Sequence, residues 1–257
     1  MMNSLKKFIF ELQEITNLVI FAFIGVFKKP HYLMDLIKQM DLIGVGSLPI
    51  VLLTGFFTGG VLILQTFPTL AYYGGQGEAG RAVATSLVRE LGPVLAALMV
   101  SGRIGSAISA ELGSMVVSQQ IDAMRALGTD PNRKLVAPRI IALILMLPLL
   151  TVAADIFGII GGGIVASGLF NQNYDVYVTS VRNGITVEDI IGGIIKPLFF
   201  GLIIGSISCY KGLGTTEGTV GVGRSTTSAV VLSSIVVIIF DFFLSRAIMS
   251  VFGTKII

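Results

Sequence analysis

The chain has 257 residues, of which 53% are hydrophobic and only 13% are charged, and its formal net charge is +3. A soluble domain carries about a quarter charged residues, and several runs here exceed the roughly 20 apolar residues that cross a bilayer core. This composition excludes an ordinary soluble domain and predicts an all-α, polytopic membrane protein. The single Cys209 excludes an intrachain disulfide, and the single His31 argues against a metal site built by this chain.

The first 41 residues are expected to lie outside the membrane spans. Glu11, Gln13 and Glu14 interrupt the apolar character of residues 1–30, and the uninterrupted part, residues 15–27, is short for a span. We therefore expect an amphipathic helix in the cytoplasmic membrane interface, anchored by flanking lysines. A sixth span is the alternative. The anchoring lysines are Lys6, Lys7, Lys28 and Lys29.

Five apolar runs are long enough to cross a bilayer. Gly55 and Gly59 in the first run, and Gly201 and Gly205 in the fourth, have the GxxxG spacing that lets another helix approach closely. The runs make up residues 42–252 of a single domain that covers residues 1–257. The predicted spans are residues 42–67, 79–100, 138–170, 190–210 and 228–252.

The distribution of lysine and arginine predicts the orientation of the chain. Basic residues gather in the N-terminal segment, in the polar residues 101–137 and in the loop of residues 211–227, whereas Arg81 and Arg182 are among the few on the other side. Cytoplasmic segments carry the excess of basic residues in membrane proteins. We therefore expect the N-terminus and both polar connections to be cytoplasmic.

Three ionisable residues lie inside otherwise apolar spans. Arg89 and Glu90 fall about half-way along the second predicted span, and Lys196 falls inside the fourth. A charge at such depth costs a few kcal/mol, so it usually faces a partner, a cavity or water. One interpretation is a structural ion pair, or a lysine that reaches the headgroups. The other, which we favour, is a cavity in which Arg89 and Lys196 meet an anionic group.

Residues 110–127 have the pattern of an amphipathic helix. At about 100° per residue, the polar side chains share one narrow sector opposite an apolar stripe that only Gln120 breaks. Such a helix is typical of a membrane surface, and Gly128 followed by Asp130-Pro131 would end it. The helix is either a solvated connection or a docking surface for a cytoplasmic protein. Its polar residues are Glu111, Ser114, Ser118, Asp122 and Arg125.

Motifs for catalysis or for nucleotide binding do not occur in the sequence. There is no GxxxxGK[ST] loop, and residues 212–218, GLGTTEG, have the wrong spacing for a dinucleotide fingerprint and lie between spans. HExxH and GxSxG motifs do not occur either. We therefore expect a subunit that is not an enzyme and that holds no cofactor of its own.

One stretch is specific enough to indicate a family. Residues 86–131 read SLVRELGPVLAALMVSGRIGSAISAELGSMVVSQQIDAMRALGTDP, and this stretch closely resembles the signature of MlaE/YrbE-type permeases. These are the membrane subunits of ABC transporters that work with MCE-domain proteins. The N-terminal segment, the five spans and the late loop GVGRSTTSAVV at residues 221–231 agree with the resemblance, which thus covers nearly the whole chain.

The resemblance implies an assembly and a cargo. Two copies of the permease would pair in the bacterial inner membrane and bind two cytoplasmic ABC ATPase subunits, which would bind the ATP. A periplasmic hexamer of MCE-domain proteins and a small cytoplasmic STAS-type subunit belong to the implied assembly, which has no nucleic-acid partner. The implied cargo is phospholipid, moved between the inner and outer membranes to maintain outer-membrane lipid asymmetry.

The resemblance also implies roles for individual residues. The stretch between spans two and three, residues 104–127, corresponds to the coupling helix of the family, so we expect its polar face to contact the ATPase. The chain departs from the family at residues 74–77 and at Gln119-Gln120, where many relatives have Glu-Gln. The lipid-cavity positions of the family fall on Leu62, Leu70, Tyr73, Arg89, Glu90 and Lys196.

Two other functions fit parts of the sequence. A non-transporting scaffold that only seats an MCE ring and an ATPase would use the intramembrane charges as structural ion pairs. A secondary transporter would use Arg89 and Glu90 as a proton relay. Dependence on ATP would exclude the secondary transporter, and lipid crosslinking near Tyr73 or Arg89 would separate a lipid transporter from a scaffold.

Overall fold

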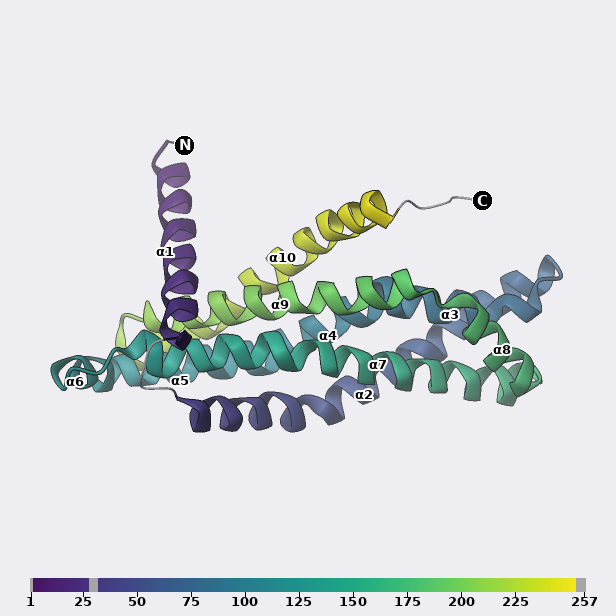
Figure 1. Cartoon of the computed structure of the whole chain (residues 1–257), viewed down its shortest axis with the longest axis horizontal. Coiled ribbons are helices and arrows are strands. Elements are labelled where there is room, and N and C mark those ends of the chain that lie inside the picture. The colour runs from purple at the N-terminus through teal and green to yellow at the C-terminus, as the bar shows by residue number, and fades with distance from the viewer. Residues whose placement is uncertain (1, 28–31, 253–257) are drawn as a thin grey trace.

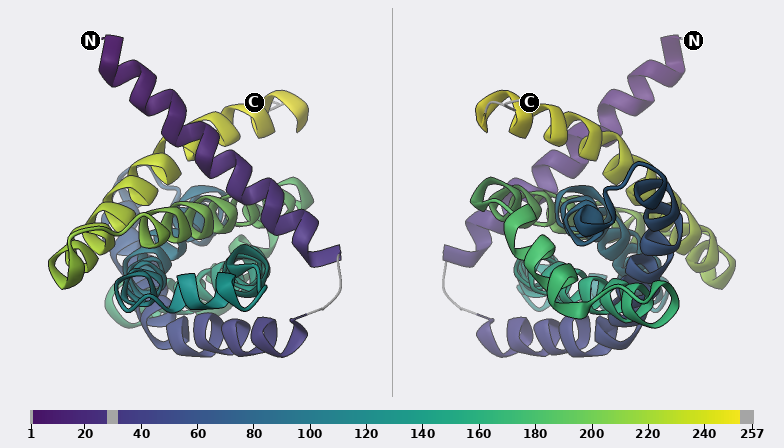
Figure 2. Two further views of the ribbon diagram at one scale, coloured as in Figure 1. Left: turned by 90° about the vertical axis from the view of Figure 1, so that its left-hand side faces the viewer. Right: turned by 90° about the vertical axis from the view of Figure 1, so that its right-hand side faces the viewer.

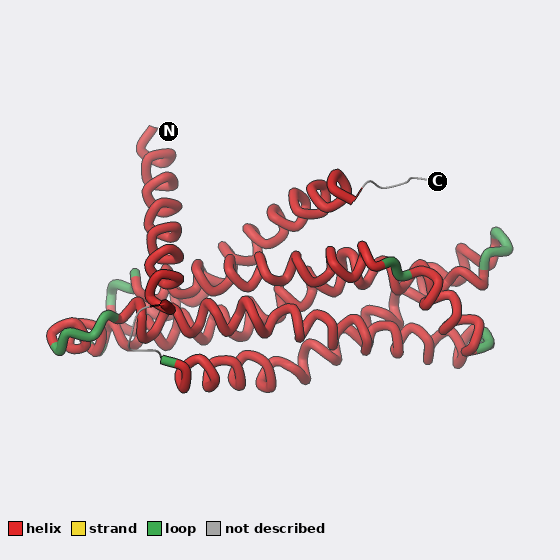
Figure 3. The backbone as a smooth tube through the Cα atoms, in the orientation of Figure 1, coloured by secondary structure: helices red, strands yellow, loops and turns green. Residues whose placement is uncertain are grey.

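The chain folds into a bundle of long helices. A computed structural model describes residues 2–27 and 32–252, and every regular element in these ranges is helical, which confirms the all-α prediction. Most of the long helices run roughly along a common axis, and most of the connections between them lie at the two ends of the bundle (Figures 1 and 3). We call these ends the α6 end and the α8 end after the short helices found there (Figure 1).

The prediction of five spans is confirmed. Among the described residues, five helices or runs of helices are long and apolar enough to cross a membrane. Most are longer than the apolar runs that predicted them, because the helices continue into polar residues at their ends. The first, third, fourth and fifth spans are α2 (Leu33–Tyr72), α7 (Ala137–Phe170) with the π-helical turn η4 (Asn132–Val136) before it, α9 (Val187–Leu213) and α10 (Gly218–Phe252).

The second span is a composite helix that runs from Gln76 to Val117. It contains two π-helical turns, and such turns each insert one extra residue and occur frequently at functional sites. Both turns lie between ordinary helical segments, so the span is continuous. In chain order its parts are the short turn η1 (Gln76–Glu78), α3 (Ala79–Ser86), the π-helical turn η2 (Leu87–Leu91), α4 (Gly92–Val100), the π-helical turn η3 (Ser101–Gly105) and α5 (Ser106–Val117).

The predicted continuous helix over residues 104–127 is wrong. Its first part belongs to the second span, and its last part is a separate short helix, α6 (Gln120–Ala126). The helix is interrupted at Gln119, which adopts a left-handed conformation with a φ of 58°. The last regular turn of α5 ends just before it, where both the N–H and the hydroxyl of Ser118 donate to the Ser114 carbonyl, at 3.0 and 2.8 Å. A helical wheel assumes an unbroken helix, so it cannot detect this break.

The N-terminal helix α1 (Met2–Phe27) does not run along the bundle. It crosses the bundle near the α6 end, at a steep angle to the spans (Figures 1 and 2). Glu14 accepts a hydrogen bond from the Tyr210 hydroxyl at 2.9 Å, and Glu11 lies 3.6 Å from Lys211, so α1 is tied to the end of α9. This arrangement agrees with a helix in the membrane interface and not with a sixth span. The side chains of the predicted anchors Lys6, Lys7, Lys28 and Lys29 lie outside the described residues.

Glycines bring α2 and α9 close to α7. A Cβ atom at Gly55 or Gly59 would collide with backbone carbonyls of α7, and a Cβ atom at Gly201 would lie 2.6 Å from the Leu143 carbonyl oxygen. The backbones of α2 and α9 therefore approach α7 as the two GxxxG pairs predicted. At the α8 end, α8 (Tyr174–Gly184) covers this core and buries Tyr177.

Replacement of Gly59 by leucine is expected to destabilise the chain, because the new side chain would meet the Gly158 carbonyl of α7. Overpacking of this kind costs about 1–3 kcal/mol. The midpoint of thermal unfolding in detergent should therefore fall by several degrees.

Gly168 in α7 offers a matched control, because a Cβ atom there would meet nothing within 4 Å. Gly168→Ala should preserve or raise the unfolding midpoint, since alanine is the better helix former by about 1 kcal/mol. A Gly59→Leu variant as stable as the unmodified chain would contradict the close contact between α2 and α7.

Candidate functional site

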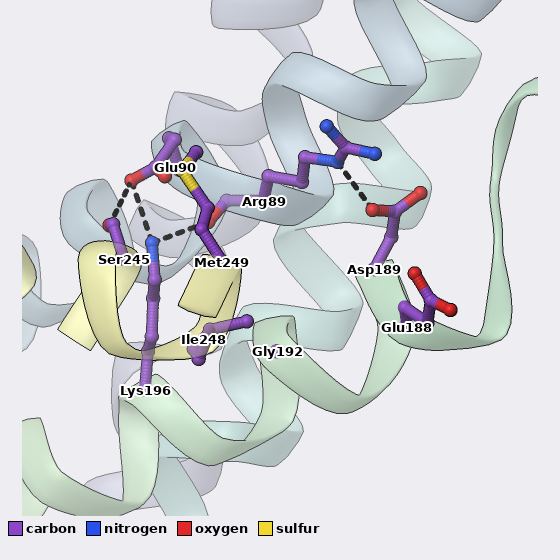
Figure 4. Close-up of a pocket in the computed structure, with 9 residues that line it drawn as sticks. All are labelled: Arg89, Glu90, Glu188, Asp189, Gly192, Lys196, Ser245, Ile248 and Met249. Atoms are coloured by element: carbon purple, nitrogen blue, oxygen red, sulfur yellow. Dashed lines mark hydrogen bonds and ion pairs between the residues drawn. The ribbon is translucent and has the colours of Figure 1, made fainter. Parts of the chain in front are cut away.

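A polar pocket lies where the second span, α9 and α10 meet (Figure 4). The π-helical turn η2 contributes two charged residues, α9 contributes residues of its first three turns, and α10 contributes residues near its end. Gly193 lets α9 approach η2 here, because a Cβ atom at this position would lie 2.7 Å from the Val88 carbonyl oxygen. The lining residues are Arg89, Glu90, Glu188, Asp189, Gly192, Lys196, Ser245, Ile248 and Met249.

Pro93 explains why a lysine from another span is needed at η2. Proline has no N–H group, so Pro93 cannot donate to the carbonyl four residues before it, as other residues of an α-helix do. That carbonyl belongs to Arg89, and the Lys196 ammonium donates to it at 2.7 Å. An unpaired backbone carbonyl is unfavourable at membrane depth. Lys196 therefore satisfies a backbone group that the local sequence leaves without a partner.

The Lys196 ammonium also holds three spans together. Its side chain is 2% exposed, and it lies 2.6 Å from Glu90 Oε2 on η2 and 3.1 Å from Asp241 Oδ1 on α10. The Ser245 hydroxyl donates to the same Glu90 oxygen at 3.1 Å. A charge buried this deeply is tolerated only where opposite charges and hydrogen bonds surround it. The charged groups of the second, fourth and fifth spans therefore form one network.

Arg89 is oriented by the beginning of α9. Its Nε donates to Asp189, whose side chain is 4% exposed. Asp189 is itself held by a capping box, in which it accepts from the Thr186 N–H at 2.9 Å while Thr186 Oγ1 accepts from the Asp189 N–H. The Arg89 side chain is 45% exposed, and within the described part of the chain no hydrogen bond occupies its two terminal nitrogens. These nitrogens are donors that an anionic group in the pocket can use.

The structure separates the predicted lipid-binding residues into two groups. Arg89, Glu90 and Lys196 come together in the pocket. Leu62 and Leu70 instead pack against the apolar cluster toward the α8 end, and Tyr73 is an exposed residue at the end of α2. None of the second group lines the pocket of this chain. The role of both groups in lipid binding stays a prediction.

Sequence reasoning missed Asp189 and Ser245, which line the pocket, and Asp241, which pairs with Lys196 behind it. Asp241 carried the same signal as Lys196, since it is an ionisable residue inside an apolar span. Asp189 could have been found as the third residue of a capping box that begins at Thr186. Ser245 had no comparable signal, because a lone serine in a span is common. Across residues 2–27 and 32–252, no three His, Cys, Asp or Glu side chains gather as a metal site would require.

The polar residues predicted on the 104–127 stretch do not share one surface. Glu111 lies on α5, where its Oε1 is 2.8 Å from Arg139 Nη2 at the beginning of α7. Ser114 and Ser118 are exposed at the end of α5. Asp122 and Arg125 form an exposed ion pair of 3.2 Å on α6. The break at Gln119 thus divides the set, and its contact with an ATPase stays a prediction.

Comparisons with known proteins agree on one family. The sequence profile of the family described as Permease MlaE matches residues 36–247. A probable ABC transporter permease protein of Rickettsia typhi is 41% identical over 93% of this chain and 93% of its own length. The intermembrane phospholipid transport system permease protein MlaE of Haemophilus influenzae is 37% identical over 82% of this chain and 81% of its own. The chloroplast protein TRIGALACTOSYLDIACYLGLYCEROL 1 of Arabidopsis thaliana is 39% identical over 81% of this chain and 60% of its own.

Replacement of Lys196 by methionine is expected to destabilise the chain strongly, because Glu90 and Asp241 would lose the cation between them. Removal of one partner from a buried ion pair costs about 3–5 kcal/mol, which should appear as a large fall in the unfolding midpoint in detergent. The triple variant Lys196→Met/Glu90→Gln/Asp241→Asn should recover much of the loss, since it removes the uncompensated charges as well.

The exposed ion pair between Arg224 and Glu217 is the matched control, because its N–O distance is also 2.6 Å. Exposed pairs contribute about 1 kcal/mol or less, so Arg224→Met should change the midpoint little. Equal losses from Lys196→Met and Arg224→Met would argue against the buried network.

Proposed function

The chain belongs to the MlaE permease family, and from this premise we propose that it carries phospholipid between two membranes in an ATP-driven transport system. The name of the Haemophilus influenzae relative, an intermembrane phospholipid transport system permease protein, supports this cargo. The proposed assembly contains a second copy of the chain in the inner membrane, a cytoplasmic ABC ATPase that binds ATP, a small STAS-type subunit, and a periplasmic hexamer of MCE-domain proteins. Its proposed role is to maintain outer-membrane lipid asymmetry.

The proposal rests on the free hydrogen-bond donors of Arg89. Its Nε is held by Asp189, while its terminal nitrogens remain as donors in a pocket between apolar spans. A guanidinium group binds phosphate through two parallel hydrogen bonds. Because water is scarce at this depth, such contacts are stronger than they would be on a soluble surface. Arg89 is therefore well placed to bind the phosphate of a phospholipid.

Lys196 and Glu90 have a different part in the proposed site. The Lys196 ammonium is surrounded by Glu90, Asp241 and the Arg89 carbonyl, so it links the spans that form the pocket. Glu90 lines the pocket with a side chain that is 40% exposed. We expect the negative charge of Glu90 to offset part of the positive charge in the pocket where the cargo would bind.

The acyl chains require apolar surface beyond the pocket. The exposed faces of the spans supply it, and Leu62, Leu70 and Tyr73 extend it at the far end of α2. We assign these three residues to the part of the cargo path nearest the α8 end. This end would face the periplasm, since the basic residues favour a cytoplasmic α6 end.

The end of α5 and helix α6 form the proposed docking surface for the ATPase. Ser114, Ser118, Asp122 and Arg125 are exposed there, and Leu127 beside them is 83% exposed. Protein interfaces combine apolar and polar side chains, and this surface exposes both kinds. Movement of the ATPase would reach the membrane through α5, which continues the second span.

A non-transporting scaffold is the second candidate function. The complete burial of Lys196 among its partners favours it, because a structural ion pair needs no cargo. The two candidates differ in the free donors of Arg89, which a scaffold would not use.

Arg89→Gln is expected to lower ATP-dependent phospholipid transfer roughly tenfold, because a charged hydrogen bond contributes about 1.5–3 kcal/mol. The measurement uses the permease with its ATPase and periplasmic partners, reconstituted in vesicles that contain labelled phospholipid, with separate acceptor vesicles. Arg81→Gln is the control, since Arg81 pairs with Glu78 on the exposed surface of α3 at 3.8 Å. A scaffold predicts no transfer by the unmodified chain and no effect of Arg89→Gln on its assembly.

Asp122→Lys is expected to weaken binding of the ATPase, because it reverses a charge on the proposed docking surface. The fraction of ATPase that co-purifies with the permease in mild detergent measures the effect. Glu217→Lys is the control, since Glu217 is also exposed and paired with an arginine but lies in the connection between α9 and α10. Equal co-purification of all three chains would exclude α6 from the interface.

A further inference from the structure

The short helix α6 is joined to the rest of the chain mainly through its neighbours in sequence. Of its residues, Ile121 is buried at 3% exposure, whereas Asp122 and Arg125 project into the surroundings. On one side it follows α5 through the left-handed Gln119, and on the other it leads to η4 and α7. A force applied to α6 is therefore passed to α5 and to the beginning of α7.

Arg139 is a buried cation at the point where these two paths meet. It lies in the first turn of α7 and is 3% exposed, and its Nη1 donates to the Leu135 carbonyl at 3.0 Å. Its Nη2 lies 2.8 Å from Glu111 Oε1 on α5. A buried guanidinium is strongly destabilised without an opposite charge beside it. Glu111 supplies that charge, although its own side chain is 56% exposed.

Helix α5 is held on its other side by close contact with α9. A Cβ atom at Gly212 of α9 would lie 3.0 Å from the Ser109 carbonyl oxygen of α5. Close contacts continue on both sides of this point: a Cβ atom at Gly105, the last residue of η3, would lie 2.9 Å from Ser208 Oγ of α9, and one at Gly113 of α5 would lie 2.7 Å from Thr215 Oγ1 just after α9. The small residues allow the two helices to touch along α5. The ion pair with Arg139 adds a link from α5 to α7.

Helix α5 is also the end of the composite span that contains η2. The run from Gln76 to Val117 is continuous through η3 and α4, so α5 and Arg89 belong to one helical rod. If α5 were joined to the bundle only through η3, a displacement of α6 could bend α5 without moving the rest of the span. If α5 is also fixed to α7, it moves without bending, and the displacement reaches η2 through η3 and α4.

We propose that Glu111 and Arg139 form a positioning pair, which makes α5 and α7 move as one body and so transmits movement of α6 to the pocket at Arg89. The proposal rests on the function proposed above. Neither residue touches cargo, and Glu111 faces Arg139 instead of the exposed surface of α6. The pair therefore acts on the coupling between ATP hydrolysis and lipid transfer, and not on binding of the ATPase.

The experiment compares Glu111→Gln and Glu111→Lys with the unmodified chain in the complete reconstituted complex. Both variants change the more exposed partner and keep the buried Arg139 side chain itself. Co-purification of the ATPase and the rate of ATP hydrolysis should stay within twofold of the unmodified complex. ATP-dependent phospholipid transfer should fall by about fivefold or more, and further for Glu111→Lys than for Glu111→Gln because lysine repels Arg139.

Two further measurements separate coupling from a merely structural role. The charge exchange Glu111→Arg/Arg139→Glu should transfer more lipid per ATP hydrolysed than Glu111→Lys alone, because opposite charges face each other again. Glu217→Lys breaks an exposed ion pair of 2.6 Å elsewhere and should change neither rate.

Distinct results would overturn the proposal. Unreduced transfer by Glu111→Lys would show that the pair transmits nothing. A parallel fall in ATPase binding, ATP hydrolysis and transfer would assign Glu111 to docking or folding. An absence of transfer by the unmodified complex would instead overturn the proposed function, and the positioning role with it.

Discussion

The buried ammonium group of Lys196 is the constraint on which the rest of the polar pocket depends. Pro93 has no N–H group to donate to the Arg89 carbonyl. The Lys196 ammonium of the fourth span donates to this carbonyl instead. The same ammonium requires counter-charges, which Glu90 and Asp241 supply from the second and fifth spans. The second, fourth and fifth spans are therefore linked at one point along the bundle, and Arg89 lines the pocket at this point. In hydrocarbon surroundings this arrangement is specific, because each group would be strongly unfavourable alone.

The second span connects two regions of different chemistry. At η2 it places Arg89 in the pocket, and some turns later α5 carries Glu111 to Arg139 at the α6 end. Two π-helical turns interrupt the span without breaking it. A continuous helix of this kind transmits displacement along its axis more effectively than a chain of loops. The proposed coupling of ATP hydrolysis to cargo movement thus needs no long pathway of side chains.

The sequence predicted the fold well and the site in part. The five spans and the close approach at Gly55 and Gly59 were predicted correctly, because length, hydropathy and glycine spacing are local properties. Arg89, Glu90 and Lys196 were found as charges in apolar runs, and the same signal at Asp241 was overlooked. The helix over residues 104–127 was predicted wrongly, because the left-handed conformation of Gln119 leaves no mark in a periodic pattern.

The sequence by itself determined that this membrane protein has five segments long and apolar enough to cross a bilayer, and that charged residues lie inside them. Whether a segment can cross a bilayer depends mainly on its own length and composition. Only the tertiary structure decided which charges meet. Glu90 and Lys196 are 106 positions apart, and their contact depends on how the second and fourth spans cross. The structure likewise decided that Lys196 is enclosed while Arg89 keeps free donors, since burial is set by neighbouring helices and not by the residue itself.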